Sequence, residues 1–504
     1  MTDPNARLPL PQRHWPRWSA VLVGAAVLAG CAVGPNWTPP AAPSEQGYTP
    51  TPVPSRTVES AGEAGRAQTL DPMQTVPADW WTLFHSPALD GLIREGLQHS
   101  PTVLAAKDTL SAAQANLDAQ SSALFFPAVD GKLGASRQRV SGAEIGVPSA
   151  PPFTYNLYNA SVGVSYRPDV FGGSRRSVEG FRAAVDAQRY EVEAAYLALS
   201  SNIVTTAFAE ASYRGQLAAV RDVVKSQRDS LAVVERQFNA GAASKAEVLA
   251  QRTQVASSEA LLPPLEKALA QTRHRLAVLT GSAPNRADLP QFTLADFKLP
   301  VQVPVSLPSE LVHNRPDIAA TEASVHQASA QVGVAVANLY PQIALTASVG
   351  YESATVSDLF KSPNGIWSLG AGLTQPIFHG GELRARRRAA EAEYRVALDT
   401  YQATVLDAFR QVADALRAIE WDAQALAAAT DADDLARQSL DLTRRQYDIG
   451  SVSYLVLLNA ERQYSDALRN RVQAEALRYS DTAALYVALG GGWWNRTASA
   501  VAAN

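Results

Sequence analysis

The stretch RQFNAGAASKAEVLAQRTQ (236–254) recurs as RQYDIGSVSYLVLLNAERQ (445–463). In each copy a glycine, Gly241 or Gly450, follows a long run without proline. A glycine at such a place is typical of a helix that ends in a left-handed cap, after which the chain turns back. Each copy therefore predicts the tip of a helical hairpin.

The whole chain is written twice around these two tips. Four further segments recur in the same order: LQHSPTVLAA (97–106) with LVHNRPDIAA (311–320), LFFPAVDGKLGAS (124–136) with NLYPQIALTASVG (338–350), SYRPDVFGGSRR (165–176) with LTQPIFHGGELR (373–384), and LAVLTG (276–281) with LYVALG (485–490). Five ordered matches predict two structural units of about 200 residues each.

Apolar residues recur every seven positions in the segments that precede the tips. They are Val178, Val185, Val192 and Leu199, then Leu217, Val224, Leu231 and Phe238, and in the second unit Leu398, Val405, Val412, Ile419 and Leu426. A seven-residue repeat makes a left-handed coiled coil, and the phase shift between the first two sets changes its winding. A helix of about 63 residues reaches roughly 95 Å, about three times the thickness of a membrane's hydrocarbon core.

Two segments in each unit alternate apolar with small or polar side chains. The apolar sets are Val129, Gly131, Leu133, Ala135; Tyr158, Ala160, Val162, Val164, Tyr166; Ile343, Leu345, Ala347, Val349, Tyr351; and Trp367, Leu369, Ala371, Leu373. The Ser, Gly and Thr residues between them would make a poor soluble core, so the pattern favours transmembrane β-barrel strands over a half-buried sheet. Four strands cannot close a barrel, and an open edge in lipid leaves backbone groups unpaired, so we predict an obligate oligomer.

Cys31 is the only cysteine of the chain, and it follows the apolar run Ser19–Gly30. That run is too short to span a membrane and suits the core of a signal peptide. The sequence LAGC (28–31) resembles the bacterial lipoprotein box, which implies cleavage before Cys31 and lipidation of its thiol. Ala32 in place of Asp then favours the outer membrane. The alternative is a buried or reactive cysteine behind a cleaved signal.

These features divide the chain into six parts. We predict a signal peptide (1–30), a Pro-rich extended tether (31–78), a first repeat (79–281), a connector (282–310), a second repeat (311–490) and a tail (491–504). Within the repeats, strands are expected over about 125–168 and 340–377, and coiled-coil hairpins over about 174–280 and 382–489. The connector is expected to pack around the helices with the two ends of the chain.

The chain shows no motif of an enzyme. It contains no G-x-S-x-G, no Walker A motif and no H-E-x-x-H, and its 7 histidines lack the spacing of metal ligands. A net charge of −4 and a pI of about 6.0 give no basic field for nucleic acid. We therefore expect no catalytic residues, no cofactor, no metal and no nucleic-acid partner.

A lipid-anchored chain of two hairpin-plus-coiled-coil units resembles the outer membrane factor (TolC-like) family, especially the NodT-type lipoproteins of RND efflux systems. The matching segments are CAVGPNW (31–37), ADWWTLFHSPALDGLI (78–93), PDVFGG (168–173), NRPDIAATEASV (314–325), QPIFHGG (375–381) and LYVALGGGW (485–493). The resemblance implies a mixed α/β homotrimer whose twelve-stranded β-barrel, four strands per chain, continues into a periplasmic α-helical barrel.

That family implies an exit duct in the outer membrane of a Gram-negative bacterium, which conducts drugs and toxic compounds passively. Its expected partners are a periplasmic adaptor and an inner-membrane RND pump, which selects the substrates. One alternative is the same duct in an ABC-driven type I protein secretion system. Another is a coiled-coil tether without a pore.

The resemblance also implies where the periplasmic end closes. The positions that match are Leu455 and Asn459, one helical turn apart, with Tyr447 and Gln446 before the tip. Better-known ducts carry Asp where this chain has Asn459 and Arg where it has Gln446, so closure here is expected to depend on Leu455 and on Tyr447 hydrogen bonding. The alternative interpretation makes Leu455 and Asn459 ordinary coiled-coil positions.

Residues at both tips are the expected docking site of the adaptor. They are Arg236, Gly241, Arg445 and Gly450. The alternative role for these turns is simple helix capping, and the two roles are compatible.

Overall fold

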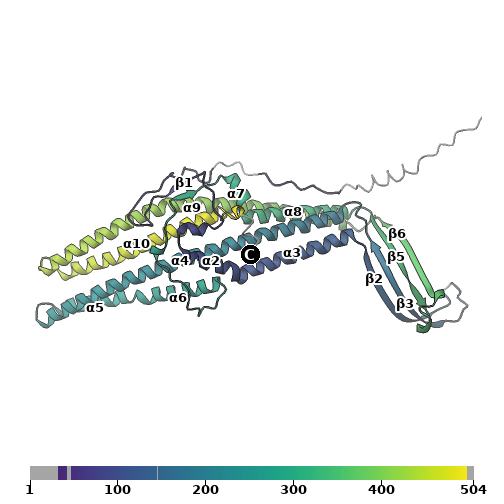
Figure 1. Cartoon of the computed structure of the whole chain (residues 1–504), viewed down its shortest axis with the longest axis horizontal. Coiled ribbons are helices and arrows are strands. Elements are labelled where there is room, and N and C mark those ends of the chain that lie inside the picture. Colours follow the sequence, from purple (N-terminus) through teal and green to yellow (C-terminus); the bar gives the residue numbers. More distant parts are fainter. Residues whose placement is uncertain (1–31, 42–46, 145, 497–504) are drawn as a thin grey trace, which may run out of the picture. The chain divides into compact units, whose positions relative to one another are not determined.

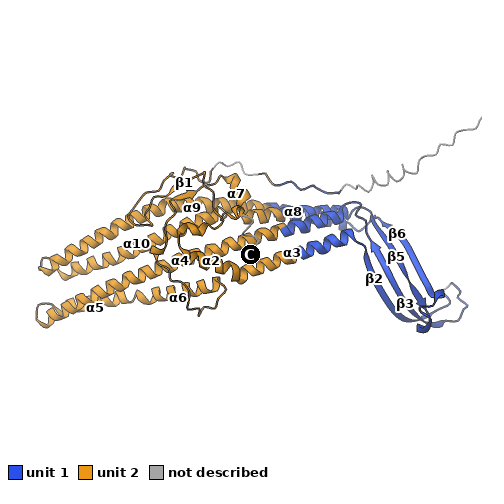
Figure 2. Ribbon diagram, viewed as in Figure 1, with its two compact units in different colours: residues 1–39, 113–185, 324–398 blue, residues 40–112, 186–323, 399–504 orange. Residues whose placement is uncertain are grey.

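The computed structural model describes residues 32–41, 47–144 and 146–496, so Cys31, the signal segment 1–30 and the end of the tail lie outside the described residues. The chain forms two compact units (Figure 2). Unit 1 contains residues 1–39, 113–185 and 324–398, and unit 2 contains 40–112, 186–323 and 399–504. Figure 1 labels the helices and strands of both units.

Unit 1 contains a four-stranded antiparallel sheet in the order β2-β3-β5-β6. The strands are β2 (Ala128–Val140), β3 (Phe153–Tyr166), β5 (Gln342–Ser353) and β6 (Gly365–Thr374). Two short 3-10 helices, Val356–Asp358 and Ser362–Asn364, lie in the loop between β5 and β6. Each sequence repeat thus contributes one β-hairpin, and β3 and β5 join the two hairpins.

The register of the sheet confirms the predicted faces. Val162 of β3 lies opposite Val349 of β5, and Val349 lies opposite Trp367 of β6. Because directly opposed residues share a face, the apolar sets of all four strands line the same side. Small and polar residues line the other side, where the Ser348 and Ser368 hydroxyl oxygens are 2.8 Å apart.

The apolar face of this sheet is exposed within the chain. The exposed fractions are 86% for Leu133, 79% for Leu369, 79% for Trp367 and 62% for Val349. Within the described residues, β2 and β6 each pair with a strand on one side only. An exposed apolar face of this extent marks a surface that contacts either a membrane or another protein chain.

Each repeat sends a long helix out of its β-hairpin. Helix α4 (Gly173–Asn239) and helix α9 (Glu382–Asp448) both contain 67 residues. Most of the predicted seven-residue positions are buried, among them Val192 and Val412 at 8% and 0% exposure. Phe238, at the tip, is 38% exposed and marks the end of this buried row of apolar residues.

The two return segments differ. The second is one helix, α10 (Tyr454–Ala488), whereas the first is divided into α5 (Lys245–Glu259) and α6 (Leu262–Leu279). Pro263 and Pro264 stand in the first turn of α6. Neither has a backbone N–H, and each ring clashes with the carbonyl four residues before it, so a continuous helix cannot pass through them.

The remaining elements lie mainly in unit 2. They are β1 (Thr69–Asp71), the 3-10 helix η1 (Trp80–Phe84), α2 (Pro87–His99), α3 (Pro101–Phe125, which enters unit 1), the 3-10 helix Leu294–Asp296, β4 (Gln302–Pro304), α7 (Pro308–Asn314), α8 (Pro316–Ala337, which enters unit 1) and the 3-10 helix Trp493–Asn495. No helix in the described ranges is both long and apolar enough to cross a membrane.

The connector packs with both ends of the described chain. Strand β4 pairs in parallel with β1, and the Tyr486 hydroxyl of α10 donates a hydrogen bond to the Gln302 carbonyl of the connector at 3.5 Å. Residues 56–71, which composition alone assigned to an extended tether, are packed onto unit 2, because the buried Gln68 amide donates to the Pro300 carbonyl at 3.0 Å. Behind this layer the rings of Trp80, Phe84, Phe208, Phe297, Tyr479 and Tyr486 form an aromatic core.

At the turn from strand to helix, the spacing between the two repeats in the structure differs by one residue from the spacing in the sequence match. The match SYRPDVFGG/LTQPIFHGG aligns Gly172 with Gly380, 208 residues later. In the structure α4 and α9 begin 209 residues apart, and Gly381 (φ 89°) rather than Gly380 (φ 58°) lies 209 residues after Gly172 (φ 81°). An offset of 209 residues places Leu373 of β6 at the position of Val164 of β3. Apolar residues then stay on the same face in both repeats, whereas a shift of one residue would turn them to the other face.

Candidate functional site: the tips of the helical hairpins

The first tip is a left-handed helix cap, as predicted. Gly241 has φ 78°, its N–H donates to the Phe238 carbonyl at 3.0 Å, and the Ala242 N–H donates to the Gln237 carbonyl at 2.8 Å. This pair of bonds satisfies carbonyls that the last turn of α4 leaves free. A Cβ added at Gly241 would meet no atom within 4 Å, so φ alone favours glycine there.

The second tip repeats this geometry. Gly450 has φ 74°, its N–H donates to the Tyr447 carbonyl at 2.9 Å, and the Ser451 N–H donates to the Gln446 carbonyl at 2.8 Å. Two turns 209 residues apart therefore reverse the chain in the same way.

The return helices begin differently. At the start of α5, the Ser244 hydroxyl accepts from the Glu247 N–H at 3.2 Å and the Ser244 N–H donates to Glu247 Oε2 at 2.8 Å. Helix α10 follows Ser453, whose side chain makes no capping hydrogen bond. Because an N-cap contributes about 1 kcal/mol to a helix, the start of α10 is held less firmly by local bonds than the start of α5.

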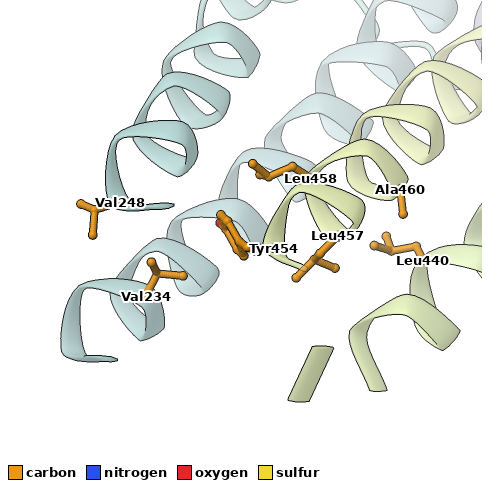
Figure 3. Close-up of a cluster of buried hydrophobic side chains, with 7 residues drawn as sticks. All are labelled: Val234, Val248, Leu440, Tyr454, Leu457, Leu458 and Ala460. Atoms are coloured by element: carbon orange, nitrogen blue, oxygen red, sulfur yellow. The ribbon is translucent and has the colours of Figure 1, made fainter. Parts of the chain in front are cut away.

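A buried cluster joins the two hairpins just behind their tips (Figure 3). It takes one residue each from α4, α5 and α9 and the rest from α10: Val234, Val248, Leu440, Tyr454, Leu457, Leu458 and Ala460. Tyr447 packs against its edge, with its ring centroid 5.3 Å from that of Tyr454. The start of α10 is therefore positioned by packing rather than by its cap.

Leu455 and Asn459 lie outside this cluster. Leu455 is 64% exposed and Asn459 is exposed, whereas Tyr454, Leu457 and Leu458 are buried. The two residues share a face because they are four positions apart on a helix. They are therefore not core positions of the chain's own coiled coil, and they present an apolar and a polar side chain at the surface.

Side-chain hydrogen bonds also hold the hairpins together. The buried Tyr454 hydroxyl donates to Gln251 Oε1, and Gln251 Nε2 donates to the Gln227 carbonyl at 2.8 Å. Nearer the tips, the Tyr447 hydroxyl donates to Gln237 Oε1 at 3.4 Å. Tyr447 was among the residues predicted from the sequence, whereas Tyr454 and Gln251 were not. The apolar spacing of Tyr454 with Leu457 and Leu458 is the one signal that could have found it.

A buried carboxyl, that of Glu461, lies one helical turn beyond Leu457 on α10, further from the tip. Glu461 is 3% exposed, and Arg444 Nη2 lies 3.7 Å from its Oε1. Burial raises the pKa of Glu461, and the charge of Arg444 opposes this rise. Arg444 also donates to Ser226 Oγ of α4 at 2.6 Å, so one guanidinium contacts both hairpins.

The four expected docking residues are exposed at the tips. Arg236 and Arg445 stand near the ends of α4 and α9, and Gly241 and Gly450 stand in the turns. Arg236 donates only to the Ala232 carbonyl of its own helix, at 3.2 Å, among the bonds of the described chain. Gln446 is partly buried beside them. Cys31 lies outside the described residues, and within them no group of three or more His, Cys, Asp or Glu side chains could hold a metal ion.

Comparisons with known proteins agree with this architecture. The family model described as "Outer membrane efflux protein" matches residues 92–282 and 307–491. The pyoverdine export outer membrane protein OpmQ of Pseudomonas putida is 31% identical over 457 residues, which cover 88% of this chain and 94% of the relative. Nodulation protein T of Rhizobium leguminosarum bv. trifolii is 30% identical over 478 residues, 93% of this chain and 96% of the relative.

Solved structures show the same fold. The outer-membrane channel OprN superposes with a TM-score of 0.81 at 26% identity, covering 92% of this chain and all of that one. The open state of the MtrE outer membrane channel of Neisseria gonorrhoeae superposes with a TM-score of 0.77 at 27% identity, covering 93% and 100%. Both repeats and nearly the whole chain are matched, and the chain belongs to the outer membrane efflux protein family.

Proposed function

We propose that this protein is the outer-membrane exit duct of a tripartite efflux pump. The observation that carries the proposal is the four-stranded sheet of unit 1, with one exposed apolar face and two unpaired edges in the described chain. Lipid would cover the apolar face, and small polar residues would line a water-filled lumen. The duct conducts passively and has no catalytic residues of its own, so the energy comes from an inner-membrane RND pump coupled through a periplasmic adaptor.

The free edges support a trimer. Four antiparallel strands place β6 and β2 in opposite directions, so β6 of one copy can pair antiparallel with β2 of the next around a rotation axis. Three copies give a closed barrel of twelve strands, above the roughly eight of the smallest membrane barrels. Closure removes both edges, which lipid could not solvate.

The tips supply the gate and the docking surface. In the trimer, Leu455 and Asn459 of three copies face one another as an apolar and a polar ring, which narrow the periplasmic aperture. Opening moves the tip of α9 and α10 away from α4 and α5, which requires breaking the Tyr447–Gln237 hydrogen bond. The exposed Arg236, Gly241, Arg445 and Gly450 contact the adaptor.

Lipidation of Cys31 anchors the chain in the outer membrane. Residues 32–37 follow Cys31 directly in the sequence and belong to unit 1. The Val33 N–H donates to the Phe171 carbonyl at 3.2 Å, and the Trp37 ring stacks on His326 at 4.7 Å. Val33, two residues after the proposed anchor, thus lies beside the turn where β3 leads into α4.

The substrates are small molecules that the pump selects. Relatives named for export of pyoverdine and for efflux of toluene favour this function over secretion of proteins by an ABC-driven system. A test compares the accumulation of a panel of drugs and dyes in host cells with and without the gene. Higher accumulation on deletion, restored by the wild type and less by Cys31→Ser, supports an anchored efflux duct. Unchanged accumulation together with loss of a secreted protein would establish the type I alternative.

A further inference from the structure

A cleft of about 290 Å³ lies between the two helical hairpins of unit 2, behind their tips. Its lining comes from α4 of the first hairpin and from α9 and α10 of the second. We propose that this cleft binds a small linear diamine, an aliphatic chain with an ammonium group at each end. The charges, the buried polar groups and the apolar walls of the cleft favour a ligand of this kind.

The charged side chains around the cleft are mainly acidic. They are the carboxylates of Asp222, Asp441 and Glu461 and the guanidiniums of Arg437 and Arg444. Arg437 pairs with Asp434, which does not line the cleft, so the charge of Arg437 is already compensated. Asp222 and Asp441 are exposed, and no ion pair within the described residues involves either of them. Three carboxylates thus surround one remaining guanidinium, and a ligand with two positive charges balances them.

Two buried polar side chains, Glu461 and Gln227, form the inner end of the cleft. Glu461 is 3% exposed and Gln227 is 1% exposed, and both line the cavity. The Gln227 side-chain atoms Oε1 and Nε2 lack hydrogen-bond partners within the described chain. Arg444 Nη2 lies 3.7 Å from Glu461 Oε1, which is too far for a hydrogen bond. Since buried polar groups are nearly always hydrogen-bonded, the inner end has room for a donor, and an ammonium can donate to both side chains.

Apolar side chains line the rest of the cleft. Val223 of α4 and Leu440 of α9 are buried, and Leu468 and the ring of Tyr464, both on α10, are half-buried. Methylene groups of a ligand gain free energy by packing against such side chains, whereas a metal ion gains nothing from them. Within the described ranges, no group of three or more His, Cys, Asp or Glu side chains could hold a metal ion. An organic cation with an aliphatic body therefore fits the cleft better than a metal ion does.

A diamine bound here bridges the two hairpins. One ammonium contacts Glu461 of α10 at the inner end, and the other lies between Asp222 of α4 and Asp441 of α9 at the rim. In the proposed duct, opening moves α9 and α10 away from α4 and α5, so a ligand that holds these helices together keeps the duct closed. This effect on the gate rests on the proposed function, whereas the binding itself does not.

Titration calorimetry of the full-length, membrane-extracted protein with 1,4-diaminobutane tests the site. We expect saturable binding. Glu461→Gln keeps the shape of the side chain but removes the buried charge, and it should weaken binding at least about tenfold. Asp222→Asn removes an exposed charge and should weaken binding about two- to fivefold. Asp229→Asn, at an exposed carboxyl of α4 that does not line the cleft, is the matched control and should bind as the wild type does.

Two further probes test the chemistry of the ligand. The monoamine 1-aminobutane has the same carbon chain with a single charge, and it should bind about two- to fivefold more weakly than the diamine. Mg²⁺ carries two charges without a carbon chain and should not displace the diamine at equal concentration. Displacement by Mg²⁺, or equal binding of the diamine to the wild type, Glu461→Gln and Asp222→Asn, would overturn the inference. If Glu461→Gln fails to fold, the exposed variants Asp222→Asn and Asp441→Asn serve as the test.

Current through the protein in a planar lipid bilayer separates the site from the duct. We expect 1,4-diaminobutane to lower the resting conductance of the wild type and to have less effect on Glu461→Gln. Binding that leaves the conductance unchanged would overturn the bridging of the hairpins. A protein that conducts but binds no diamine would overturn the inference and leave the duct intact. A protein that binds the diamine but passes no current under any condition would contradict the duct and leave the site intact.

Discussion

At the scale of single residues, the side chains that matter are those that hold α10 against the first hairpin. Tyr454 is 4% exposed, and its hydroxyl donates to Gln251, which is fully buried. A hydroxyl in this place restrains the segment that carries Leu455 and Asn459. In the proposed duct, the neutral aperture therefore depends on packing and hydrogen bonds behind it.

Removing this hydroxyl should loosen the resting aperture. Tyr454→Phe leaves the buried Gln251 oxygen without its donor, which costs about 1–3 kcal/mol. We expect a higher resting conductance in planar bilayers and a lower melting temperature. Tyr464→Phe is the matched control, since Tyr464 packs against the same cluster without contributing a hydroxyl bond to Gln251. Equal effects of the two variants would contradict this role of Tyr454.

Adding charge at the aperture should close it more tightly. Asn459→Asp gives the trimer a ring of three carboxylates, which oxygen-preferring divalent cations bind. We expect the resting conductance to fall when Mg²⁺ is present and to recover with a chelator, while the wild type shows no such response. A conductance that is unchanged or higher in Mg²⁺ would count against Asn459 as an aperture residue.

At the scale of elements, α9 and α10 carry an acidic pair far from the tip. Asp422 of α9 lies beside Asp481 of α10, and the buried Arg478 is near both. Burial and the Asp481 carboxyl raise the pKa of Asp422 to about 7, and Arg478 lowers it in part. Because the pKa is higher in the folded protein, stability is lost as pH rises from about 4 to about 7.

Asp422→Asn should remove this pH-dependent loss of stability. Each pKa unit corresponds to about 1.4 kcal/mol, so the free energy of unfolding gains at most about 4 kcal/mol at pH 8. Solvent screening at the partly exposed side chain makes this gain smaller. The melting temperature of the variant should exceed that of the wild type at pH 8, and the two should converge towards pH 4. Asp399→Asn, at an exposed carboxyl of α9, is the control. Parallel pH profiles for wild type and Asp422→Asn would contradict the pairing.

The elements could be predicted from the sequence better than their connections. Alternation predicted the two faces of the sheet because side chains in a strand point to opposite sides at every step, and the register places all four apolar sets together. The sequence match was off by one residue at Gly380 because it aligned both glycines of each repeat, whereas the helices that follow begin 209 residues apart. The bond between Tyr454 and Gln251 joins residues 203 apart, and no local pattern reports such a pair.

At the scale of the whole molecule, duplication gives the chain two β-hairpins, which pair through β3 and β5. Joining β3 to β5 inside the chain leaves β6 and β2 as free edges of the kind that this pairing covers. In the proposed trimer, further copies of the chain cover those edges. The proposed barrel is joined by four connections per copy to α3, α4, α8 and α9, of which α4 and α9 reach the tips.

The most direct test of the proposed duct is the current through single trimers of the purified full-length protein in a planar lipid bilayer. We expect discrete conductance steps that rise in Tyr454→Phe, because the duct crosses the bilayer and narrows at its tip. Inserted trimers that pass no current in either the wild type or this variant would contradict the proposed duct, and they would favour a structural tether without a pore.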